Sequence, residues 1–277
     1  MDEFRAANRE TWEALAEHHP GTEFYDVEAF LDGESTLDPV EPEELGPVEG
    51  RSLLHLQCHF GLDTLSWARR GAEVTGVDFA QQAVETAREL AAEAGLADRA
   101  TFHQSDVYDL PDRLGGRFEV VYTSFGVLTW LPDLDRWASV VEQFLAPGGT
   151  FYIAEFHPVA FTLDEASTAE APRFSYPYFP REEPLGFEEE GSYADEEAEI
   201  GEGATYEWPH SLGEVVTALC DAGLDIEFLH EYPWSRFAAV EAMEEREHGR
   251  YYLPGTEEVP LVPLVFTLRA RALESDP

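Results

Sequence analysis

Residues 53–88 read LLHLQCHFGLDTLSWARRGAEVTGVDFAQQAVETAR, and this stretch decides the fold class. Two short apolar runs, residues 52–56 and 73–77, are each followed by a segment with helical periodicity. In residues 81–94 the apolar side chains recur every three or four positions, which is the spacing of a helix packed on a sheet. Short apolar strands that alternate with such helices are typical of a parallel sheet covered by helices on both faces.

The same alternation continues on the C-terminal side of this stretch. Further strands are predicted at 100–103, 118–123, 150–156, 225–230 and 259–270, the last at the sheet edge because of its prolines. Helices are predicted over 133–145 and over 211–222, where Ser211 and Glu214 have the spacing of a capping box. The sequence therefore predicts an α/β fold, with a Rossmann-like, seven-stranded, mostly parallel sheet and helices on both faces.

Interruptions of this pattern predict the domain organisation. Residues 1–49 are expected to form an N-terminal helix, 4–18, and a linker rich in proline and glycine, 39–50. Residues 50–156 and 211–277 form the core. The intervening 157–210 is rich in proline, acids and aromatics, and we expect a small antiparallel cap over the sheet there. Between the last two strands, 234–252 reads as an acidic helix and loop.

The charge balance is the strongest compositional signal. The chain has 57 acidic residues against 17 basic ones, all arginine, for a formal net charge of −40. Such self-repulsion weakens a compact state at ordinary ionic strength but is largely screened in molar salt, where the Debye length is about 3 Å. We infer a halophilic protein. An acidic nucleic-acid mimic or a disordered acidic tail would also lower the pI, but here the acids are spread through core-forming segments.

Other features narrow the class of protein. No run approaches the roughly 20 apolar residues that span a bilayer, and the first residues lack a secretory signal, so we expect a cytoplasmic protein without membrane contact. Cys58 and Cys220 are far apart in the sequence, which argues against a disulfide framework. No histidine or cysteine cluster has metal-ligand spacing, so no metal is expected.

The residues that end the first four strands are the candidate binding site, because the carboxyl ends of parallel strands converge on one crevice. Asp78, 17 residues after Gly61, could accept hydrogen bonds from both hydroxyls of a ribose. Asp106 could accept from the amine of adenine, with Phe79 and Val107 against the purine. Each aspartate could instead simply cap a helix or form a turn.

The order of these segments resembles class I S-adenosylmethionine-dependent methyltransferases over residues 50–157. Besides the opening stretch, the resemblance rests on FHQSDVYDLP, residues 102–111, and FEVVYTSFGVLTWLPDLDRWASVVEQFLAPGGTFYIAEFHP, residues 118–158. It implies that S-adenosylmethionine is the cofactor and S-adenosylhomocysteine its product. It also implies that loop 57–61 holds the methionine portion, Asp78 the ribose and Asp106 the adenine. Pro147 to Gly149 would form the turn that precedes the fifth strand.

The loop departs from the family pattern at three positions. The usual acid falls on His55 and two usual glycines fall on Gln57 and His59, so we expect Gln57 and Asp63 to engage the amino-acid end of the cofactor. The predicted cofactor site comprises Gln57, Cys58, His59, Gly61, Asp63, Asp78, Phe79, Asp106, Val107, Ser124 and Phe125.

The methyl acceptor is predicted to be a small molecule. His157, directly after the fifth strand, is the first candidate for an optional general base, and His210 is the second. The N-terminal helix and residues 157–210 together are expected to form a lid that excludes water.

Three alternatives were considered, and two of them have sequence tests. An NAD(P)-dependent oxidoreductase or epimerase expects Gly-x-Gly-x-x-Gly where the chain reads Gln-Cys-His-Phe-Gly-Leu-Asp. A nucleic-acid methyltransferase expects a basic stripe, which is absent, so no nucleic-acid partner is expected. A non-catalytic S-adenosylmethionine-binding protein remains open, and the sequence does not indicate an oligomeric state.

Overall fold

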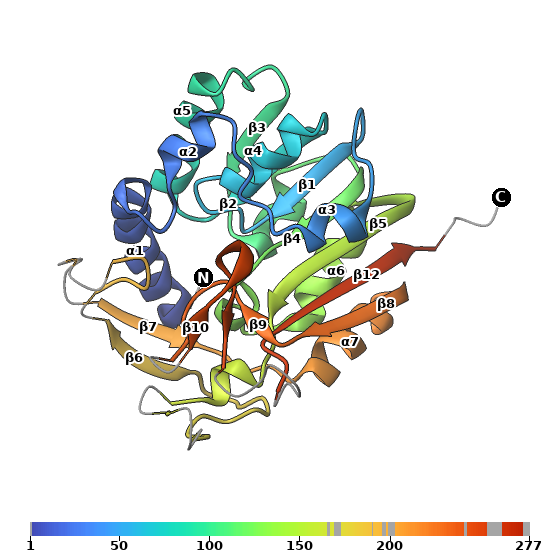
Figure 1. Cartoon of the computed structure of the whole chain (residues 1–277). Helices are drawn as coiled ribbons and strands as arrows, with labels where there is room; N and C mark the ends of the chain where they lie inside the picture. The colour runs from blue at the N-terminus through green and yellow to red at the C-terminus, as the bar shows by residue number, and fades with distance from the viewer. Residues whose placement is uncertain are drawn as a thin grey trace.

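The structure is a computed structural model that describes residues 2–164, 167–168, 173–189, 191–195, 198, 203–240, 243–253 and 262–273. Its centre is a seven-stranded sheet with the order β3-β2-β1-β4-β5-β12-β8 (Figure 1). The strands are β1 (Ser52–Leu56), β2 (Glu73–Asp78), β3 (Ala100–Gln104), β4 (Phe118–Thr123), β5 (Leu145–Phe156), β8 (Leu224–Tyr232) and β12 (Val265–Ala272). The pairs from β3 to β5 are parallel, whereas β12 is antiparallel to both of its neighbours. The predicted fold is confirmed.

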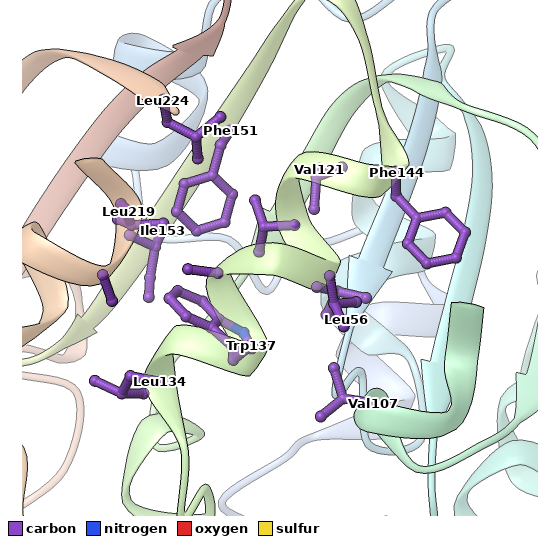
Figure 2. Close-up of a cluster of buried hydrophobic side chains, with 14 of the residues drawn as sticks. Leu56, Val107, Val121, Leu134, Trp137, Phe144, Phe151, Ile153, Leu219 and Leu224 are labelled. Carbon is purple, nitrogen blue, oxygen red and sulfur yellow. The ribbon is translucent and has the colours of Figure 1, made fainter. Parts of the chain in front are cut away.

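The helices pack on both faces of the sheet because successive strand residues point to opposite sides. On one face, α6 (Leu134–Phe144) and α7 (Leu212–Asp221) bury Trp137 and Leu219 against β4, β5 and β12, and Figure 2 shows both in one cluster with Ile153. On the other face lie α4 (Leu62–Arg69) and α5 (Gln81–Glu93). Three shorter or peripheral helices complete this side: α1 (Glu3–His18), α2 (Val27–Leu31) and α3 (Val40–Leu45).

Two small antiparallel sheets flank the central one. The first pairs β6 (Leu185–Glu189) with β7 (Gly203–Glu207), within the segment where an antiparallel cap was predicted. Within this sheet, β7 lies beside α1 (Figure 1). Asn8 fixes the contact, because its side chain donates to the Tyr206 carbonyl and accepts from the Tyr206 N–H, both at 2.7 Å.

The second small sheet corrects a prediction. Residues 234–252 were expected to form a helix and loop, but the described part contains β9 (Trp234–Ser235), β10 (Glu244–Glu245) and β11 (Tyr251–Tyr252) in the order β10-β11-β9. These strands are two residues long, too short to reveal an alternating pattern in the sequence.

Two further expectations differ from the structure. The stretch predicted as a linker contains α3, whose Val40, Glu41 and Leu45 are buried. The last strand was predicted at the sheet edge, but β12 lies between β5 and β8, and its described residues begin after both prolines. Residues 259–261 of that predicted strand lie outside the described residues. Of the helices in the described ranges, none is long and apolar enough to cross a membrane.

Candidate cofactor and acceptor site

The sheet order places a topological switch point between β1 and β4, because the chain runs outward from β1 to β3 and then returns to β4. Ligands of open α/β sheets bind outside the carboxyl ends of the strands at such a point. Two adjoining cavities lie there, a smaller one of about 120 Å³ and a larger one of about 630 Å³. The residues that line both cavities mark their junction: Trp12, Tyr25, Gln57, His59, Phe125, Gly126, Trp130 and Tyr193.

The loop after β1 has the left-handed backbone typical of a glycine-rich loop, although Gly61 is the only glycine in residues 57–61. Gln57, His59 and Gly61 have φ values of 57°, 49° and 82°. A Cβ atom on Gly61 would lie 2.8 Å from the ring of Phe102, so only glycine fits there. Left-handed backbone at a non-glycine residue costs roughly 1–2 kcal/mol. The loop therefore carries strain at both positions where the sequence departs from glycine.

Asp78 ties this loop to the end of β2. Its carboxylate accepts from the backbone N–H of His59 at 2.8 Å and of Ala80 at 2.9 Å. Burial raises the pKa of Asp78 to about 6. The side chain lines the smaller cavity together with the other residues predicted to surround an adenosine: Phe79, Asp106 and Val107. The strand ends thus bring together the residues that the sequence singled out.

Asp106 has a partner that the sequence did not indicate. One of its oxygens accepts from the Tyr108 N–H at 2.9 Å, as the N-cap of a short helical segment. The other accepts from the guanidinium of Arg5 at 3.1 Å. Because Arg5 belongs to α1, the N-terminal helix reaches the floor of the smaller cavity.

Gln57 presents an unpaired acceptor at the junction of the cavities. Its amide nitrogen donates to the Val127 carbonyl at 3.2 Å, whereas its Oε1 is buried without a hydrogen-bond partner. A buried unpaired acceptor is costly unless a ligand supplies the donor. An ammonium group would satisfy it, so this position fits the amino-acid end of the expected cofactor.

Comparison with known proteins identifies this region. Residues 53–149 match the protein family described as "Methyltransferase domain". The ubiquinone biosynthesis O-methyltransferase of Alkalilimnicola ehrlichii is 36% identical over 105 residues, which cover 38% of this chain and 41% of that protein. Residues 53–149 are therefore similar in sequence to a methyltransferase domain.

Solved structures extend the likeness to most of the fold. An S-adenosylmethionine-dependent methyltransferase from Mesorhizobium loti is 22% identical, with a TM-score of 0.57 over 87% of this chain and 99% of that one. The glycopeptide N-methyltransferase MtfA, whose structure holds S-adenosylmethionine, is 19% identical, with a TM-score of 0.54 over 85% of this chain and 92% of that one. At these identities the likeness concerns the fold of the methyltransferase domain and not its acceptor.

Three other predicted cofactor residues lie in or beside the loop after β1. Asp63 lines the larger cavity and accepts from the Thr36 hydroxyl at 2.6 Å. Ser124 also lines it, and its hydroxyl is 3.1 Å from Nε2 of His55. The Cys58 thiol is buried, and because burial raises its pKa well above the usual range it stays protonated.

His55, at the position where the resemblance implies an acid, links two strands. Its Nδ1 is 2.7 Å from the Thr64 hydroxyl, and its Nε2 faces Ser124 at the end of β4. Burial lowers the pKa of His55 to about 3, so the ring is neutral at physiological pH. A neutral imidazole thus joins β1 to β4 without burying a charge.

The two predicted general bases do not lie in the larger cavity. His157 is buried, with Nε2 3.0 Å from Glu231 and its ring beside Phe266, and it lines neither the larger nor the smaller cavity. Its role as a general base stays a prediction, with the side chain outside both of these cavities. His210 has Nε2 2.7 Å from the Leu131 carbonyl and lines a third cavity, of about 50 Å³, which shares Thr129, Phe156, Phe161 and Glu207 with the larger one.

Glu155 on β5 is a site residue that the sequence did not reveal. Its buried carboxylate accepts from the backbone N–H groups of Gly126, Val127 and Leu128, which follow β4. It thereby holds the loop that carries Phe125 and Gly126 at the cavity junction. An acid inside an apolar strand could have signalled this role, since a buried carboxylate needs such donors.

Proposed function

We propose that this protein is an S-adenosylmethionine-dependent methyltransferase that transfers a methyl group to a small molecule. The observation that carries the proposal is the pair of adjoining cavities at the switch point, with Asp78 in the smaller one. Asp78 would hold the ribose, Phe79 and Val107 would contact the purine, and Gln57 would accept from the ammonium group. The larger cavity then takes the acceptor beside the junction.

The cofactor supplies a methyl group on a sulfonium sulfur, which is already activated for attack. What the protein must add is alignment of the acceptor with that methyl group, and positioning alone can lower a barrier by roughly 7–11 kcal/mol. Aromatic rings from α1, from the loop after β4 and from the 157–210 segment converge at the junction, where Trp12 meets Trp130 at 5.4 Å between centroids. They would exclude water and confine the acceptor.

A lid made of α1 and the 157–210 segment remains part of this proposal. Asn8 of α1 and Tyr25, which follows α1, contact Tyr206 and Tyr193 of the 157–210 segment, and Arg5 of α1 contacts Asp106 of the core. A general base is optional for an activated donor. If His157 nevertheless acts as one, His157→Ala should lower turnover more than it lowers cofactor affinity.

Binding separates the proposal from its main alternative. Calorimetric titration should give one-to-one binding of S-adenosylhomocysteine and no comparable binding of NAD. Tight NAD binding without S-adenosylhomocysteine binding would favour an oxidoreductase or epimerase. A protein that binds the cofactor yet transfers no methyl group to any of a broad set of small acceptors would instead be a non-catalytic binding protein.

A further inference from the structure

A single arginine lines the larger cavity among the described residues. Arg236 follows β9 in the small C-terminal sheet, and the chain has no lysine to take its place. The other formally charged residues of the lining are acids: Glu23, Asp63, Glu207 and Glu245. A cation in so acidic a lining indicates a specific anionic partner.

Contacts with the protein hold the Arg236 side chain in place. Its Nη2 donates to the Thr36 carbonyl at 2.9 Å, and its guanidinium carbon lies 5.4 Å from the centre of the Phe125 ring. The side chain is 31% exposed. A guanidinium has five N–H donors in a planar fork suited to a carboxylate, and this one hydrogen bond leaves most of them available.

The nearest acid does not neutralise this cation. Glu41 Oε2 is 3.9 Å from Arg236 Nη1, beyond hydrogen-bond distance. The Glu41 carboxyl already accepts from the hydroxyl of Tyr122 and the backbone N–H of Asp38. Its complete burial also raises its pKa to about 8, which favours the uncharged form at neutral pH. Arg236 therefore presents a net positive charge to the cavity.

Thr36 forms hydrogen bonds with both an acidic and a basic residue of the cavity. Its carbonyl accepts from Arg236, and its hydroxyl donates to Asp63 in the first turn of α4. No ion pair joins Asp63 to Arg236, although both lie within the described ranges. Two opposite charges that face one cavity without pairing are complementary to a zwitterion.

We propose that Arg236 is a carboxylate-binding residue of the larger cavity. The geometry favours the carboxylate of the cofactor's amino-acid end, with Asp63 and Gln57 receiving its ammonium group, and this part rests on the proposed function. A carboxylate on the methyl acceptor is the other source of the same chemistry. In either case the C-terminal sheet, which the sequence did not predict, supplies a binding residue to the site.

The test compares two nucleosides that differ in the group Arg236 would bind. S-adenosylhomocysteine carries the amino-acid end, whereas 5′-methylthioadenosine lacks it. Arg236→Gln should weaken S-adenosylhomocysteine about tenfold to a hundredfold, because it removes a charge-assisted hydrogen bond, and should leave 5′-methylthioadenosine affinity unchanged. Arg236→Lys keeps the charge without the fork and should recover part of the loss. Arg181→Gln, on an exposed arginine, is the control for net charge.

The remaining outcomes are also decisive. Arg236→Gln could instead leave S-adenosylhomocysteine affinity unchanged, abolish the binding of 4-hydroxybenzoate and spare the binding of neutral 4-hydroxybenzamide. The carboxylate would then belong to the acceptor. If Arg236→Gln changes the affinity for neither S-adenosylhomocysteine nor 4-hydroxybenzoate, and the variant has the melting temperature of the wild type, the assignment of Arg236 is overturned and the proposed function stands. Failure of the wild-type protein to bind either nucleoside would remove both.

Discussion

Asp78 is the residue on which cofactor binding should depend most. Two charge-assisted hydrogen bonds to the ribose, at about 1.5 kcal/mol each, imply a loss of roughly a hundredfold in S-adenosylhomocysteine affinity for Asp78→Ala. Asp78→Asn keeps the size of the side chain and one acceptor oxygen, so it should lose less. Calorimetry on the two variants measures this, and unchanged affinity in Asp78→Ala would remove the residue from the site.

The raised pKa of Asp78 predicts a pH dependence. Because burial lifts this pKa to about 6, the carboxylate is ionised above pH 6 and progressively protonated below it. Only the ionised form accepts from both ribose hydroxyls. Affinity for S-adenosylhomocysteine should therefore fall as the pH drops from 7 to 5, and this fall should be absent in Asp78→Asn. The same fall in the wild type and in Asp78→Asn would assign the titration to another group.

At the residue scale, the sequence predicted those site residues that end strands. Asp78, Phe79, Asp106 and Val107 could be placed together because the topology of a parallel sheet brings the strand ends to one edge. Arg236 and Arg5 could not, because they come from segments that lie far away in the chain, and even the predicted N-terminal helix that carries Arg5 gave no indication of where it packs. Their positions depend on tertiary packing alone.

At the scale of elements, pattern strength determined which predictions succeeded. The seven main strands and helices α4 to α7 were all predicted, although β5 begins five residues before its predicted start and β12 six residues after its predicted start. Helix α3 has only six residues and includes Pro42, so its composition resembles a linker. It is nevertheless buried, because Glu41 and Glu44 accept hydrogen bonds from Tyr122 and Tyr152 of the sheet.

Helix α1 offers a test of the lid. Removing residues 1–38 would also remove Phe30, which is 1% exposed in the core, so a point variant is sharper. Trp12 lines both cavities, whereas Glu10 on the same helix is exposed. Trp12→Ala should weaken S-adenosylhomocysteine binding several-fold and Glu10→Ala should not, since only the former opens the junction to water. Equal affinities, measured by calorimetry, would make α1 a packing element.

At the scale of the whole molecule, the net charge of −40 predicts a dependence of stability on salt. Repulsion among the acids is screened as the Debye length shortens from about 10 Å at 0.1 M to about 3 Å at 1 M. The melting temperature should therefore rise between 0.1 M and molar KCl. A melting temperature that does not change with salt would mean that the acids are not an adaptation to a salt-rich cell.

The central claim is that one molecule of the cofactor product spans both cavities at the switch point. A crystal structure of the protein with S-adenosylhomocysteine tests it most directly. The account predicts the adenosine in the smaller cavity, its ribose hydroxyls on Asp78, and the sulfur at the junction beside the larger cavity. S-adenosylhomocysteine bound away from Asp78, or a dinucleotide occupying the crevice in its place, would contradict it.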